Sequence, residues 1–188
     1  MTQFHDAELS PMHLDDVPIG YPRSLDTWVE VGGGAQAFLR PITPVDARRM
    51  AHALEFGDPE TIQRRFLTGA PPKGRGAIEY LVTPDYVWRL ALIAMDAEGN
   101  SIGIGRYEGS EGSESAEIAI VVDPQWRGRG VGSVILRHLE PHAVSVGIDR
   151  FVAFYQPDNV GVAALLKSIG YEPAPMADGL VSVAKSLV

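Results

Sequence analysis

The chain has 188 residues, of which 45% are hydrophobic and 21% are charged, a composition typical of a folded protein with one sizeable core and unlike that of a disordered or fibrous chain. It contains no cysteine, which excludes disulfides, a thiolate nucleophile and a cysteine-based metal site. Its formal net charge of -8 disfavours nucleic acid as a partner and suits basic partners such as amines.

The apolar runs of the chain are too short to cross a membrane. The longest, over residues 90–95 and 118–122, have the length of a strand. The first 20 residues are polar, contain two prolines, and lack the features of a signal or transit peptide. We therefore expect a cytoplasmic protein with a flexible tail over residues 1–20 and a single domain over residues 21–188.

The first half of the chain is predicted to hold a hairpin and two helices. Residues 27–31 and 37–39 flank three consecutive glycines, a pattern typical of a β-hairpin. An amphipathic helix should follow over residues 43–54, with Arg48 and Arg49 facing outward. The last elements of this half are a short helix over residues 58–66 and a Gly- and Pro-rich loop over residues 69–76 that can serve as a lid.

The second half is predicted to begin with three consecutive antiparallel strands. They span residues 89–95, 101–107 and 116–122, the first two joined by a hairpin signal. The remaining predicted elements are a helix over 130–138, a strand over 150–155, a helix over 159–169 and a strand over 181–185. This order indicates an α+β fold, with a mixed, mostly antiparallel sheet and helices on both faces.

A glycine-rich turn joins the strand over 116–122 to the following helix. Gly128, Gly130 and Gly132 stand at alternate positions, which lets successive main-chain N–H groups point toward one ligand. Arg127 and Arg129 add positive charge within an acidic chain. The pattern favours a phosphate-binding turn, although a tight turn without a ligand would have the same glycines.

Two other phosphate-binding motifs fit this segment less well. A P-loop requires Lys and then Ser or Thr after its last glycine, whereas Ser133 and Val134 follow Gly132. A dinucleotide fingerprint requires a third glycine where Ser133 stands, and an acidic residue at the end of the next strand. NAD binding is therefore a remoter hypothesis.

The segment resembles the acetyl-CoA loop of the GNAT superfamily of N-acetyltransferases. Gln125, Gly128 and Gly130 match its glycine motif, and Asn159 with Gly170-Tyr171 matches a second motif around the next helix. Further runs are similar to the acetyltransferase domain of bacterial protein lysine acetyltransferases: Tyr21-Pro22, Leu39-Arg40-Pro41-Ile42, Asp46, Arg64-Arg65-Phe66 and Ala116-Glu117-Ile118-Ala119. The resemblance covers about residues 21 to 172 and includes no attached cyclic-nucleotide-binding or acyl-CoA-synthetase domain.

The resemblance implies a GNAT-like fold and transfer of an acetyl or short acyl group from acyl-CoA to a primary amine. A protein lysine is the favoured acceptor, with a small-molecule amine as the alternative. No metal is expected. His138 and His142 are four residues apart, but the sequence offers no third ligand beside them, so we expect two surface residues. The residues expected to bind acetyl-CoA are Val121, Val122, Gln125, Arg127, Gly128, Arg129, Gly130, Val131, Gly132, Ser133 and Asn159.

Glu117 is the candidate general base. A lysine amine is almost fully protonated at pH 7, so transfer to it requires a base. Glu117 is a carboxylate inside an apolar strand, and the resemblance implies that it acts directly or through water. The alternative is an exposed residue that extends the acidic hairpin formed by Glu108, Glu111 and Glu114.

The proton donor for the leaving thiolate is less clearly marked. Many GNAT enzymes carry a tyrosine where this chain has Leu166, which cannot donate a proton. Tyr155 can take that role, or the thiolate can leave without an acid because its pKa is near 8.5. The missing tyrosine also leaves open a second function, a non-catalytic module that binds acyl-CoA and docks a partner.

Overall fold

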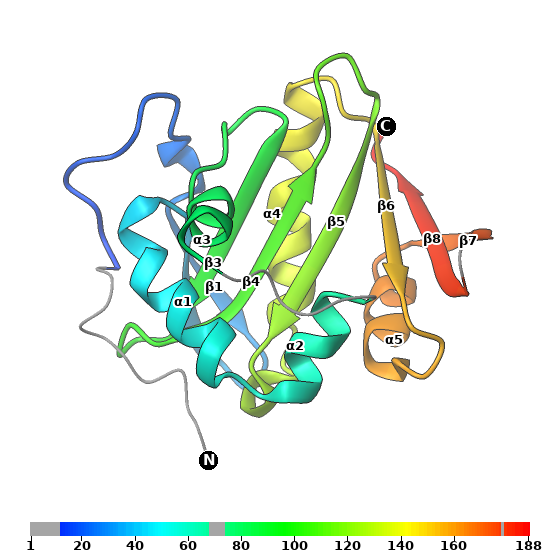
Figure 1. The fold of residues 1–188 in the computed structure, drawn as a ribbon, viewed down its shortest axis with the longest axis horizontal. Helices are drawn as coiled ribbons and strands as arrows, with labels where there is room; N and C mark the ends of the chain where they lie inside the picture. The colour runs from blue at the N-terminus through cyan, green and yellow to red at the C-terminus, as the bar shows by residue number, and fades with distance from the viewer. Residues whose placement is uncertain (1–11, 68–73, 178) are drawn as a thin grey trace.

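The computed structural model describes residues 12–67, 74–177 and 179–188, and in this part of the chain eight strands form one sheet (Figure 1). The strand order is β1-β2-β3-β4-β5-β6-β8-β7, and only β5 and β6 run parallel. The strands are β1 Thr27–Val31, β2 Ala35–Pro41, β3 Arg89–Met95, β4 Ser101–Glu108, β5 Ser115–Val122, β6 Arg150–Tyr155, β7 Glu172–Ala177 and β8 Leu180–Ser186. The predicted α+β class with a mostly antiparallel sheet is confirmed.

Helices cover both faces of the sheet. One face carries α1 (Ala47–Phe56), α2 (Pro59–Arg65) and α3 (Arg75–Val82), and the other carries α4 (Val131–Ser145) with α5 (Val160–Ser168) beside it (Figure 1). The apolar face predicted for α4 is buried as expected, since Val131, Ile135, Leu136 and Leu139 pack into the main core.

Two elements are absent from the sequence prediction. Helix α3 begins after Gly74 and packs Leu81 and Val82 against Met50 of α1. Strand β7 contains two prolines, which argue against a strand, but it lies at the sheet edge, where a missing N–H is tolerated. Residues 68–73 of the predicted lid lie outside the described residues.

Two predictions about helices need correction. Helix α4 runs to Ser145 instead of His138, because Leu139 and Ala143 are buried in the core and hold the helix past Pro141. Arg49 was expected to face outward but is only 4% exposed, because it lies on a side of α1 that lines a cavity shared with α2, β4 and β5.

Part of the predicted tail belongs to the packed fold. Leu14 is 7% exposed and joins the main core. The Arg23 side chain donates hydrogen bonds to the main-chain oxygens of Leu14 (3.1 Å) and Asp15 (2.9 Å). These contacts attach residues 12–20 to the domain, while residues 1–11 lie outside the described residues.

A buried ion pair connects the end of β2 to the start of α1. The guanidinium of Arg40 donates two hydrogen bonds to the carboxylate of Asp46, at 2.8 and 2.7 Å, and both side chains are at most 1% exposed. The same carboxylate accepts the main-chain N–H of Thr43 at 2.9 Å and so caps the turn that leads into α1. The position of α1 on the sheet therefore depends on this pair.

We expect Asp46→Ala to lower the free energy of unfolding by about 3–5 kcal/mol, because it leaves the buried charge of Arg40 without its main partner. Urea unfolding followed by circular dichroism measures the change. Glu60→Ala is the matched control, since its ion pair with Arg64 is on the surface and should contribute less than about 1 kcal/mol. Equal effects of the two substitutions would contradict this role for the buried pair.

Candidate functional site

The sheet opens between β5 and β6. These strands pair only where Ser115–Glu117 lies beside Arg150–Val152. Farther along, β5 continues to Val122 and β6 continues to Tyr155, but the two strands no longer pair with each other. A cleft of about 720 Å³ lies beside both strands. The edge of β5 over residues 118–122 faces this cleft, which gives an extended ligand a row of main-chain groups to bind.

The glycine-rich turn forms one end of the cleft. Gly128 and Gly130 have positive φ angles of 72° and 78°, which glycine adopts without strain. Gly128 lines the cleft together with residues 130–133, the first turn of α4. Within the described part of the chain, no hydrogen bond is donated by the main-chain N–H groups of residues 128–133. Together with the helix dipole, these free donors make an anion site.

Arginines add positive charge to the same end of the cleft. Arg127 donates to the main-chain oxygen of Val122 (3.3 Å) and to the hydroxyl of Thr61 in α2 (2.5 Å), and that hydroxyl in turn bonds to the carboxylate of Asp58. The contacts tie the turn to α2. Arg64 and Arg65, at the end of α2, also line the cleft.

The sequence prediction missed Arg64 and Arg65 as site residues. The feature that could have identified them is that two adjacent arginines lie near the end of a short predicted helix in an otherwise acidic chain. The prediction did not show which strand that helix crosses, and the contact of α2 with β5 is what brings the pair to the cleft.

Two residues predicted to bind the cofactor lie outside the cleft lining and instead shape the turn. The main-chain N–H of Gln125 donates to the Asp123 carboxylate at 2.8 Å, which closes the short helical turn before the glycines. The main-chain oxygen of Arg129 accepts the N–H of Gly32 at 2.6 Å, and its guanidinium lies over the ring of Trp126. Neither residue is part of the cleft lining.

Glu117 lies on the other side of the sheet from α4. Its side chain shares a face of β5 with Ala119 and Val121, and its cross-strand partner on β4 is Glu108. Glu117 is exposed and does not line the cleft. Partial desolvation raises the pKa of its carboxyl, the charge of Arg65 lowers it, and Glu108 raises it further. A carboxylate with a raised pKa is better matched to accepting a proton near neutral pH.

The remaining predicted residues lie on the β6 and α5 side of the cleft. Tyr155 lines the cleft where β6 has diverged from β5. Asn159 also lines it, and its Oδ1 accepts the N–H of Val162, which caps α5. Leu166, which stands where many GNAT enzymes have tyrosine, is 2% exposed and belongs to the core.

The histidine pair of α4 is engaged in hydrogen bonds. Nδ1 of His138 bonds to the main-chain oxygen of Val134, and Nδ1 of His142 lies 2.8 Å from the hydroxyl of Tyr107. Over residues 12–67, 74–177 and 179–188 no three His, Asp or Glu side chains come together in a way that would hold a metal ion. In the same ranges no helix is both long and apolar enough to cross a membrane.

Comparison with known proteins agrees with this geometry. The model of the acetyltransferase (GNAT) domain family matches residues 36–172. Acetyltransferase Pat of Mycolicibacterium smegmatis is 33% identical over 146 residues, 76% of this chain and 43% of that protein. Acetyltransferase PA5475 of Pseudomonas aeruginosa is 25% identical over 150 residues, 78% of this chain and 81% of that protein.

A solved structure is similar over most of the chain. The GNAT domain of S. lividans PAT has a TM-score of 0.82 at 28% identity, covering 88% of this chain and 99% of that domain. By contrast, the chain spans less than half the length of the Mycolicibacterium relative.

Gly32 supports the anion site from the β1–β2 hairpin, and we expect Gly32→Ala to weaken CoA binding roughly tenfold. A Cβ at this position would lie 2.9 Å from the Arg129 Cα and 3.0 Å from its main-chain oxygen, so the turn must shift. Isothermal titration of CoA measures the effect.

Gly76→Ala is the matched control, because a Cβ there meets nothing within 4 Å and the φ angle is not positive. An unchanged CoA affinity in Gly32→Ala would show that the turn does not depend on this contact.

Proposed function

We propose that this chain transfers an acetyl or other short acyl group from acyl-CoA to a primary amine. The chain belongs to the GNAT family of acetyltransferases. Members of this family use acetyl-CoA as cosubstrate. The single observation that carries the proposal is the row of unbonded N–H groups at residues 128–133, which lies at the end of a cleft of about 720 Å³. This pairing of an anion site with a long cleft fits a pyrophosphate followed by an extended thiol arm.

The cleft residues supply each part of a CoA molecule with a suitable partner. The pyrophosphate would take the free N–H groups of the turn, with Arg127 and Arg64 nearby as counter-charges. The pantetheine arm would lie along the open edge of β5. The main-chain N–H of Val122, which points away from β4 toward the open edge, would then stand beside the thioester and favour the oxyanion over the flat carbonyl.

A protein lysine is the favoured acceptor. The chain has a net charge of -8, Glu108 lies opposite Glu117 on β4, and the turn between β4 and β5 carries the exposed carboxylates of Glu111 and Glu114. This side of the sheet attracts ammonium groups and the basic surfaces that carry them. A free small-molecule amine would meet the same charges and is the alternative acceptor.

The proposed chemistry uses one base and one proton donor. Glu117 removes a proton from the acceptor ammonium, directly or through water, and the neutral amine attacks the thioester carbon. A C–N bond forms while the C–S bond breaks, and the oxyanion between these events is held at the end of β5. The CoA thiolate then takes a proton from Tyr155, which we place in this role because it lines the cleft on the strand facing β5. The nitrogen releases its second proton as the amide forms, and that proton restores the phenol of Tyr155 through water.

We expect Glu117→Gln to lower kcat by a factor on the order of 10² to 10⁴ while leaving acetyl-CoA affinity unchanged, because the amide cannot accept the ammonium proton. Thiol release with lysine-containing peptides measures kcat, and titration calorimetry measures affinity. Glu111→Gln, in the exposed hairpin, is the charge-matched control and should keep full activity.

A Glu117→Gln variant as fast as the parent protein would remove Glu117 from the mechanism. A parent protein that binds acetyl-CoA but acylates no amine in a broad panel would instead favour the non-catalytic acyl-CoA-binding module.

The pH dependence of kcat/KM tests the same assignment. A base acts when deprotonated, so activity should rise with pH through the raised pKa of Glu117. Glu108→Gln removes a neighbouring negative charge that raises this pKa, so the acidic limb of the profile should move to lower pH. A limb that stays in place, or that moves to higher pH, would mean that another group titrates.

A further inference from the structure

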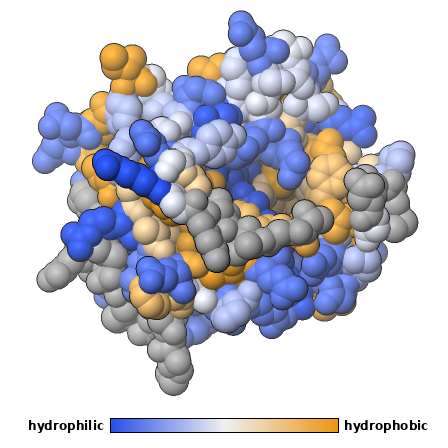
Figure 2. Space-filling model, in the orientation of Figure 1, coloured by the Kyte–Doolittle hydropathy of each residue, from blue (hydrophilic) through white to orange (hydrophobic). Residues whose placement is uncertain are grey.

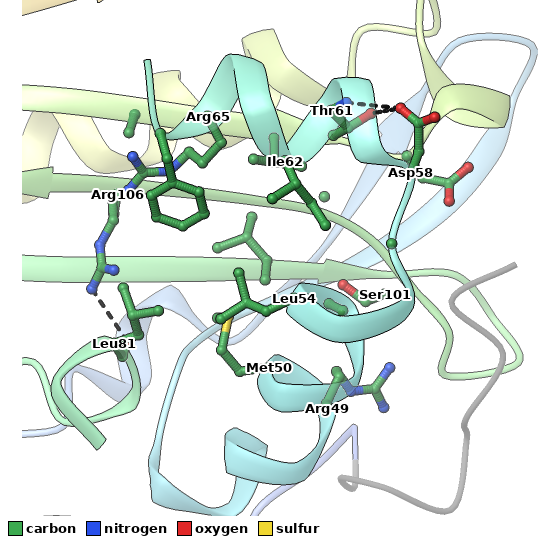
Figure 3. A pocket seen from close by; sticks show the side chains of 18 residues that line it. Arg49, Met50, Leu54, Asp58, Thr61, Ile62, Arg65, Leu81, Ser101 and Arg106 are labelled. Atoms are coloured by element: carbon green, nitrogen blue, oxygen red, sulfur yellow. Dashed lines mark hydrogen bonds between the residues drawn. The ribbon is translucent and has the colours of Figure 1, made fainter. Parts of the chain in front are cut away.

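An apolar cavity of about 90 Å³ lies on the Glu117 side of the sheet, between α1, α2 and the strands β4 and β5 (Figure 3). Figure 2 shows apolar surface gathered toward the middle of this face and ringed by polar side chains. The walls of the cavity are formed mainly by Met50, Leu54, Ile62, Phe66, Leu81 and Ile104. All of these residues lie within the described part of the chain.

This cavity meets the CoA cleft. Thr61, Arg65, Ala119 and Val121 line both spaces. Val121 and Ala119 belong to the stretch of β5 at which the proposed function places the thioester. A group attached to the carbonyl carbon of that thioester therefore has a direct path from the cleft into the cavity.

The size of the cavity limits what can enter it. An apolar protein cavity of about 150 Å³ holds one benzene molecule. A space of about 90 Å³ is smaller than this but larger than an acetyl methyl group requires. A cavity of this volume can hold a short alkyl chain.

The charges around the cavity argue against an ammonium group as its occupant. Arg49, Arg65 and Arg106 line it (Figure 3), so a lysine side chain would bring its charge close to guanidinium groups, foremost those of Arg65 and Arg106. Two carboxylates also line the cavity, but both have partners in the protein: Asp58 accepts the main-chain N–H of Thr61, and Asp123 accepts that of Gln125. Glu117 and Glu108 are not part of the lining. The amine is thus expected on the Glu117 side of Ala119, and the acyl chain on the other.

These arginines also have partners within the protein, which argues against an acidic acyl chain. Arg106 donates to the main-chain oxygen of Leu81 at 3.2 Å and pairs with Glu108 at 3.1 Å. The guanidinium of Arg65 lies over the ring of Phe66, 5.1 Å from its centroid, with Glu108 and Glu117 as neighbouring charges. The rest of the surface facing the cavity is mostly apolar.

We propose that this cavity binds the alkyl end of the acyl group, so that the protein takes aliphatic acyl-CoA donors of roughly three to five carbons in addition to acetyl-CoA. The inference rests on the proposed function, since it needs CoA in the cleft. It adds an acyl-chain site formed by α1, α2 and the β4–β5 face, and it assigns the amine and the acyl chain to opposite sides of Ala119.

Titration calorimetry with CoA, acetyl-CoA, butyryl-CoA and succinyl-CoA tests the site. Butyryl-CoA should bind on the order of tenfold more tightly than acetyl-CoA, because two more methylene groups leave water. Ala53→Leu places extra bulk in the cavity from α1 and should bring the ratio of the butyryl and acetyl affinities to about one. Ala51→Leu, on the same helix but outside the cavity lining, is the matched control and should keep the tenfold ratio.

A widened cavity gives the opposite test, which does not depend on whether Ala53→Leu folds. Leu54→Ala enlarges the site, so hexanoyl-CoA should gain affinity relative to butyryl-CoA. Equal binding of acetyl-CoA and butyryl-CoA by the parent protein, tightest binding of succinyl-CoA, or a tenfold ratio retained in Ala53→Leu would each overturn the acyl-chain site. Binding of CoA itself separates the two proposals, because its absence would overturn the proposed function as well.

Discussion

The site depends on the failure of β5 and β6 to stay paired beyond Glu117 and Val152. Main-chain N–H and C=O groups at an open strand edge need partners, and the other inner strands of this sheet find them in a neighbouring strand on each side. Where β6 diverges, the edge of β5 is left to a ligand. β6 keeps its pairing with β8 through Tyr155, so the divergence costs it no hydrogen bonds on that side.

The open edge becomes a specific site because the turn after β5 carries free donors to the same place. Gly128 and Gly130 take left-handed backbone conformations, and α4 then begins with its first N–H groups toward the cleft. The turn is held from two directions, by Gly32 of the first hairpin and by the bond from Arg127 to Thr61 of α2. An anion site of this kind works only if its donors are held in place before the ligand arrives.

The two faces of the sheet have different parts in the proposed reaction. The turn and α4 would hold the diphosphate on one face. On the other face, Glu117 and Glu108 make an acidic surface beside a cavity that is apolar and lined by arginines. The thioester would stand between them, where Ala119 and Val121 border both spaces. The buried pair of Arg40 and Asp46 contributes indirectly, because it places the start of α1, which forms one wall of the cavity.

Local patterns in the sequence were enough to determine much of the fold and the position of the glycine-rich turn. Alternating apolar runs predicted the three central strands, and three spaced glycines between a strand and a helix predicted the free N–H groups, because both depend on residues close in the chain. Tertiary structure alone decided the features that join distant segments. The contact of α2 with β5 brings Arg64 and Arg65 to the cleft. Leu81 and Val82 of α3 pack against Met50 of α1, Arg49 is buried, and Gly32 of the first hairpin bonds to the turn at Arg129. Each of these outcomes depends on which surfaces meet in the folded chain, and periodicity along one segment carries no information about its partner.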